Sequence, residues 1–132
     1  MKPFLTLHHP SNAKAYYEAG HWTPDTCYSL IEKWASQSPD AVALRDGRRT
    51  VTWGALRDWV NGVAAHFEEL GLSGGDRVSI WMSNRVEAVV TFLAASRIGL
   101  ACNPSLHRSY TCAEIGALMA RLGTKVLVTE AG

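Results

Sequence analysis

Charged residues are scarce in this sequence. Lys, Arg, Asp and Glu make up 19% of its 132 residues and the net charge is +1, whereas globular chains average about 25% charged residues. There is no basic run and no interleaving of basic and aromatic residues, which argues against a nucleic-acid partner. Charges or helix breakers interrupt every apolar stretch before it reaches about 18 residues, so the sequence predicts no membrane span.

Signals for export are also missing. The N-terminus has no sustained apolar core and no small-residue cleavage site of the kind found in secretory signals. The three cysteines, Cys27, Cys102 and Cys112, include no C-x-x-C pair. We therefore expect a reduced, cytoplasmic protein without disulfides.

The stretch RIGLACNPSLHRSYTC (97–112) is the part of the chain richest in reactive side chains. Any metal site there would take its ligands from Cys102, His107 and Cys112. A structural zinc site, however, needs four ligands and usually begins with a close cysteine pair. Nothing in the sequence places a general base beside either sulfur. We expect no metal-ligating and no catalytic residue in this chain.

No glycine-rich stretch of the sequence stands between a predicted strand and a following predicted helix, which is the order that a phosphate-binding loop requires. GLSGGDR (71–77) follows a predicted helix and precedes a predicted strand, whereas a cradle needs strand, glycines and then helix. A phosphoacceptor site would need acidic residues after several strands, and only Glu130 stands in such a position. Both glycine stretches that could suggest a cradle, 71–77 and 116–125, are interpreted as helix ends.

Hydrophobic periodicity predicts alternating helices and strands after an irregular segment at 1–24. Asp46-Gly47 between two β-prone runs predicts a hairpin with a tight turn at positive φ. Asn84 with Glu87, and Thr111 with Glu114, have the spacing of capping boxes that begin helices. The predicted helices start near Thr26, Leu56, Asn84 and Thr111, and the predicted strands are 41–45, 49–53, 77–82, 100–103 and 125–129.

This order of elements is typical of an α/β fold with an open, mostly parallel sheet, flanking helices and an N-terminal β-hairpin. The apolar runs 77–82 and 125–129 barely alternate, as expected for strands covered on both faces. We expect two parts: the irregular N-terminal segment 1–24 and a partial α/β domain over 25–132.

The order of the motifs resembles the N-terminal part of the adenylate-forming (AMP-binding) ligases, in the branch of acyl-CoA synthetases and aryl-acid AMP ligases. VTWGAL (51–56) is similar to the family's L-T-Y-x-E-L, with Ala55 where the family has Glu. The other matching segments are YEAGHWTPDT (17–26), GDRV (75–78), the helix from Asn84 to Gly99, Asn103-Pro104 and KVLV (125–128).

The resemblance implies that the full enzyme joins a small carboxylic acid to AMP with Mg-ATP and then passes the acyl group to CoA. The family's phosphate loop and catalytic Lys would lie beyond residue 132. We therefore expect a fragment truncated before the phosphate loop, inactive alone and binding no cofactor, with Arg108 as the one candidate for a contact near CoA. Uncovered sheet surface also predicts self-association of the fragment.

A second hypothesis is a self-standing α/β binding or interaction module without catalysis. The carboxylic acid, the acceptor and the oligomeric state stay open at this point. In-frame sequence downstream of Gly132 that reaches a phosphate loop would exclude the module.

Overall fold

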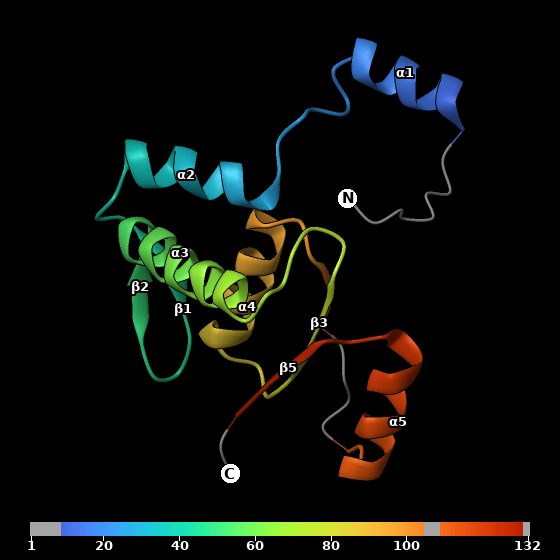
Figure 1. The fold of residues 1–132 in the computed structure, drawn as a ribbon. Helices are drawn as coiled ribbons and strands as arrows, with labels where there is room; N and C mark the ends of the chain where they lie inside the picture. The colour runs from blue at the N-terminus through green and yellow to red at the C-terminus, as the bar shows by residue number, and fades with distance from the viewer. Residues whose placement is uncertain (1–8, 105–108, 131–132) are drawn as a thin grey trace.

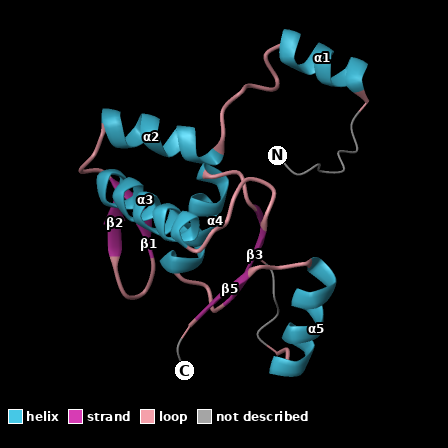
Figure 2. Cartoon of the chain, in the orientation of Figure 1, coloured by secondary structure: helices cyan, strands magenta, loops and turns pink. Residues whose placement is uncertain are grey.

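The computed structural model describes residues 9–104 and 109–130 (Figures 1 and 2). These residues form helices on both sides of a small parallel sheet, with a separate β-hairpin. The helices are α1 (Pro10–Glu18), α2 (Cys27–Gln37), α3 (Trp53–Glu69), α4 (Val86–Arg97) and α5 (Cys112–Leu122), and the strands are β1 (Val42–Arg45), β2 (Thr50–Thr52), β3 (Arg77–Trp81), β4 (Ala101–Asn103) and β5 (Val126–Thr129).

The sheet has the strand order β4-β3-β5, and both pairings are parallel. Val78 of β3 lies opposite Cys102 of β4 and Val126 of β5. Figure 1 shows α3 and α4 on one side of β3 and β5, and α5 on the other. The predicted parallel sheet with flanking helices and a hairpin is confirmed.

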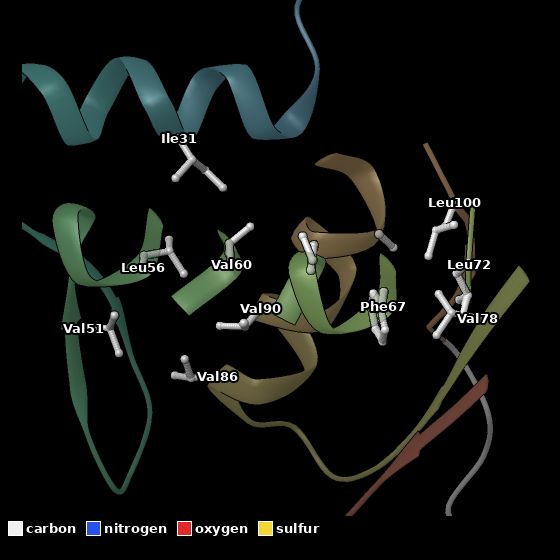
Figure 3. Packing of buried hydrophobic residues seen from close by; sticks show 13 residues of the cluster. Ile31, Val51, Leu56, Val60, Phe67, Leu72, Val78, Val86, Val90 and Leu100 are labelled. Carbon is white, nitrogen blue, oxygen red and sulfur yellow. The ribbon is translucent and has the colours of Figure 1, made fainter. Parts of the chain in front are cut away.

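The core lies between α3, α4 and the central strand. Because their apolar residues recur every three or four positions, each helix buries one face. From α3 these are Leu56, Val60, Ala64 and Phe67, all at most 3% exposed, and Figure 3 shows Leu56, Val60 and Phe67 within the packed cluster. Val90 and Ala94 of α4 complete the contact with exposures of 1% and 0%.

The hairpin is confirmed, but its predicted tight turn is wrong. β1 and β2 pair as far as Arg45 and Thr50, so residues 46–49 form the connection. Gly47 is not among the glycines with positive φ. The Asp46 side chain shapes the turn instead, because its Oδ1 accepts hydrogen bonds from the backbone N–H groups of Arg48 and Arg49, each at 2.8 Å. Aspartate side chains commonly stabilise turns by accepting hydrogen bonds from backbone N–H groups a few residues later. The turn therefore does not need a glycine at positive φ.

Three helix starts test the sequence interpretation. Thr52 caps α3 by accepting from Ala55 N at 3.3 Å, and Thr111 and Glu114 form the predicted capping box of α5. The Asn84–Glu87 capping box is wrong: the N-cap residue of α4 is Arg85, and its side chain makes no capping hydrogen bond. Asp46 Oδ2 accepts from Val86 N at 3.2 Å, so a residue of the hairpin turn caps α4.

The N-terminal region also differs from expectation. Segment 1–24 was expected to be irregular, yet Pro10–Glu18 is the helix α1, with Pro10 in the first turn where its missing N–H costs nothing. α1 has no buried residue. Its Tyr16 and Tyr17 contact Trp22, with ring centroids 5.1 and 5.7 Å apart, so aromatic contacts hold the chain that follows the helix.

Candidate functional site at the carboxyl edge of the sheet

The strand order identifies the edge at which a ligand site is expected. The connection from β3 through α4 leads to β4 on one side, and the connection from β4 through α5 leads back to β5 on the other side of β3. In open α/β sheets, ligands bind outside the carboxyl ends of the strands where the strand order reverses. The described residues at this edge include Ser83 and Arg85 after β3 and Glu130 after β5.

Glu130 folds back onto the loop between β3 and α4. Its Oε1 accepts from Ser83 N at 3.0 Å, and its Oε2 accepts from Ser83 Oγ at 2.8 Å and from Arg85 Nη1 at 2.9 Å. The side chains of Arg85 and Glu130 are 20% and 28% exposed. This partly buried, charge-assisted contact joins residues that are 47 positions apart in sequence.

A chain of ion pairs continues from Arg85 to the hairpin. Arg85 Nε lies 3.4 Å from Glu87 Oε2, and Glu87 Oε1 lies 2.9 Å from Arg49 Nη2. The Arg49 guanidinium also stands over the Trp59 ring, 5.3 Å from its centroid. The loop before α4 is therefore tied to the end of β5 and to the hairpin at once.

The hydrogen bonds of this network shift the pKa values of its members. Those from Ser83 and Arg85 lower the pKa of Glu130 to about 2. The backbone N–H groups of Arg48, Arg49 and Val86 lower the pKa of Asp46, and the hydrogen bond to Glu130 raises the pKa of Arg85. All three groups are charged at neutral pH and bonded to one another or to the backbone, so the network is built to hold segments together rather than to exchange protons.

The candidates from the sequence fall elsewhere. Arg108 and His107 lie outside the described residues. Cys102 is half-buried in β4, and burial raises the pKa of its thiol to about 11, so it is protonated and a poor nucleophile at neutral pH. Cys112 is the exposed first residue of α5. Within 9–104 and 109–130, no three His, Cys, Asp or Glu side chains are grouped to hold a metal ion.

Beside the network lies an apolar groove between α3, α4 and β5, with a volume of about 530 Å³. β5 has β3 as its neighbour on one side in the sheet, and its Val126, Leu127 and Val128 are half-buried. The other apolar side chains lining the groove include Trp59, Val63, Phe67 and Val90. This groove and the strand edge form a surface suited to a covering polypeptide.

Sequence reasoning missed the Glu130 contact because no local spacing encodes a partner 47 residues away. One signal was available. Polar residues directly after the apolar run 77–82, namely Ser83 to Arg85, stand where a parallel sheet gathers its functional side chains.

Comparison with known proteins assigns the family. The sequence model of the family described as "AMP-binding enzyme" matches residues 31–132, and the chain belongs to this family. A propionate–CoA ligase of Salmonella typhimurium is 38% identical over 105 residues, which are 74% of this chain and 17% of that enzyme. The Escherichia coli propionate–CoA ligase is 39% identical over 79 residues, or 55% of this chain and 13% of the enzyme. The chain thus spans less than a fifth of the length of these relatives.

A shorter relative and a solved structure add to this. An uncharacterized protein of Mycobacterium tuberculosis is 34% identical over 109 residues, which cover 81% of this chain and 62% of that protein. The apo structure of Mycobacterium smegmatis MbtA matches with a TM-score of 0.82 and 26% identity, over 92% of this chain and 23% of MbtA. The described fold is therefore that of the N-terminal region of an adenylate-forming ligase. Within the described residues, no helix is long and apolar enough to cross a membrane.

Proposed function

We propose that this chain is the N-terminal part of an ATP-dependent acyl- or aryl-CoA ligase. In the full enzyme, a small carboxylic acid is adenylated with Mg-ATP, and the acyl group then passes to CoA as a thioester. The observation that carries the proposal is the family match over 31–132 together with the similarity to propionate–CoA ligases. Free cysteines are typical of a reducing compartment, which supports a cytoplasmic enzyme.

The chain alone is inactive under this proposal. Adenylation depends on donors and a metal positioned around the phosphates. The charged side chains at the carboxyl edge, Arg85 among them, are committed to internal partners. Any contact of Arg108 with CoA is a proposal that rests on the family resemblance.

The partner of the chain is the remainder of the ligase. The groove between α3, α4 and β5 is lined mainly by apolar side chains, and an uncovered apolar strand edge favours pairing with another chain. Without that covering we expect the polypeptide to self-associate at roughly tens of micromolar concentration, within the micromolar-to-millimolar range in which exposed apolar surface and unpaired strand edges cause association.

A second candidate is a self-standing α/β interaction module. The relative from Mycobacterium tuberculosis favours it, because this chain covers 62% of that protein. Most of that shorter protein therefore corresponds to the region matched here. The two candidates differ in what the groove does: the ligase needs it covered by its own later residues, and the module offers it to another protein.

Calorimetric titration with Mg-ATP tests the proposal. The chain alone is expected to release no binding heat, and co-expression with residues 133 onward of its own reading frame is expected to create ATP binding and thioester formation with CoA. Micromolar ATP binding by the chain alone contradicts the proposed inactivity. A reading frame that stops without a phosphate loop supports the module instead.

A further inference from the structure

The contacts around Glu130 have the composition of a binding site for a carboxylate. Three donors converge on its two oxygens: Ser83 N at 3.0 Å, Ser83 Oγ at 2.8 Å and Arg85 Nη1 at 2.9 Å. All three belong to the loop between β3 and α4. A backbone N–H, a hydroxyl and a guanidinium form the strong, charge-assisted hydrogen bonds that proteins use to bind free carboxylates.

The loop that carries the donors has further anchors besides Glu130. Ser83 follows β3, which is paired on both sides. Arg85 is oriented by Glu87, with Nη2 to Oε1 at 3.4 Å, and Glu87 is itself paired with Arg49 at 2.9 Å. Asp46 fixes the start of α4 by accepting from Val86 N. The loop is therefore anchored at both ends by the central strand and by the hairpin.

The occupant is anchored more weakly than the donors. Glu130 directly follows Thr129, the last residue of β5, and β5 is bonded to β3 on one side. The residues of β5 are half-buried or exposed, whereas Val78 and Ser79 of β3 are fully buried. The end of β5 is therefore less firmly anchored than the loop that carries the donors.

We propose that Ser83 and Arg85 form an oxyanion cradle for which Glu130 is the built-in occupant, so that the end of β5 is held by a contact that a free carboxylate can replace. The ligand class is a small monocarboxylate, which presents two oxygens as Glu130 does. This site goes beyond the proposed ligase function, because it needs neither ATP nor CoA.

Chemical rescue tests the cradle. Glu130→Ala empties it, and we expect a lower melting temperature than for the unmodified chain. Acetate should raise the melting temperature of the variant back toward that of the unmodified chain, and the increase should saturate. We expect the increase at roughly 0.1 M acetate, a concentration at which a weak ligand can stabilise the folded state measurably. Sodium chloride at equal ionic strength should not restore it, and the double variant Glu130→Ala with Ser83→Ala should need more acetate for the same effect, because one of the three donors is gone.

Glu114 offers a matched control. Its Oε2 also accepts from a backbone N–H and a hydroxyl, those of Thr111, at 2.7 and 2.8 Å. It lies three positions from its partner, on an exposed helix end without an arginine in the contact. Glu114→Ala should show no acetate rescue. Equal rescue of both variants, or none of Glu130→Ala, overturns the proposal.

A second measurement covers the case in which Glu130→Ala does not fold. The carboxyl of Glu130 can be titrated by NMR in the unmodified chain, where Arg85 faces it directly, and Glu87, Arg49 and Asp46 make up the rest of the network. An occupied cradle predicts titration near pH 2, together with a change in the Ser83 amide signal. Titration at the ordinary glutamate value of 4.5, with the Ser83 amide unmoved, overturns the proposal.

Discussion

The two sides of this molecule are held together by different forces. On the side of α3 and α4, the packed face of α3 is buried to 3% exposure or less, including Leu56 and Phe67. On the side of β5 and α5, Ile115 is the buried residue of the helix, and the strand residues are half-buried or exposed. Figure 1 shows α3 and α4 on one side of the paired strands β3 and β5, and α5 on the other.

Polar contacts hold β5 in place, whereas apolar burial holds α3 and α4 together. Ser79 Oγ and Thr124 Oγ1 lie 2.8 Å apart, and Lys125 Nζ lies 3.0 Å from Asp76 Oδ2, whose side chain is 2% exposed. Glu130 closes the far end of β5. The difference teaches that apolar burial stabilises the contact between α3 and α4, whereas hydrogen bonds and ion pairs position β5, and that the apolar groove lies where α3, α4 and β5 meet.

The largest effect is expected in the apolar half. Leu56→Ala should lower the free energy of unfolding by about 3 kcal/mol, because a fully buried leucine loses its transfer energy and leaves a cavity. Urea denaturation measures it. Leu70→Ala is the matched control, since Leu70 at the end of the same helix is 54% exposed, and its loss should be within about 0.5 kcal/mol. Similar losses for the two variants would contradict the packed α3 face.

Removing a polar tie should have a smaller effect on the β5 side. Lys125→Met leaves the buried Asp76 without its ammonium partner. Because Lys125 itself is 51% exposed, we expect a loss on the order of 1–2 kcal/mol, between the values of exposed and buried pairs. Lys33→Met, at an exposed site on α2, controls for the charge change. Equal losses of unfolding free energy for the two variants would show that the Lys125–Asp76 ion pair does not stabilise the fold.

Acid should weaken the β5 side through Glu130. Its pKa falls from 4.5 to about 2 in the folded chain, so the folded state favours the carboxylate. The resulting stabilisation is complete above pH 4.5 and disappears as the pH falls toward 2. The stability difference between the unmodified chain and Glu130→Gln should therefore shrink between pH 6 and pH 3, roughly as proton linkage requires. A difference that does not change with pH would contradict the contact.

The smallest losses of stability are expected at two helix starts, one with the predicted N-cap and one without it. Thr111→Ala removes the N-cap of α5 and should cost about 1 kcal/mol. Asn84→Ala should cost within about 0.5 kcal/mol, as for an ordinary surface change, because Asp46 rather than Asn84 caps α4. Thermal unfolding of both variants checks this. A larger loss for Asn84→Ala would restore the capping box read from the sequence.

Local patterns explain what the sequence could predict. Helix periodicity, the Thr111–Glu114 spacing and the apolar runs at 77–82 and 125–129 all act over a few residues, and all correspond to elements of the structure. Glu87 has the same spacing from Asn84 as Glu114 has from Thr111, yet it pairs with Arg49 and Arg85. Its partners come from tertiary structure, which no local spacing reveals.

The same limit applies to the candidate site. Reading residue types at strand ends could place Ser83, Arg85 and Glu130 at one edge of a parallel sheet. It could not show that the carboxylate of Glu130 contacts both Ser83 and Arg85, because that depends on the β3–β5 register, in which Trp81 lies opposite Thr129. The turn of the hairpin is a further case, since the Asp46 side chain accepts hydrogen bonds from Arg48 and Arg49 within the turn and from Val86 at the start of α4.

Native-state hydrogen exchange tests the difference between the two sides most directly. Amides of α3 and β3 should exchange through global unfolding, whereas amides of β5 and α5 should exchange through a separate opening of lower free energy. Lowering the pH toward 3 should reduce protection on the β5 side first. Equal exchange free energies on both sides, falling together with pH, would contradict the account.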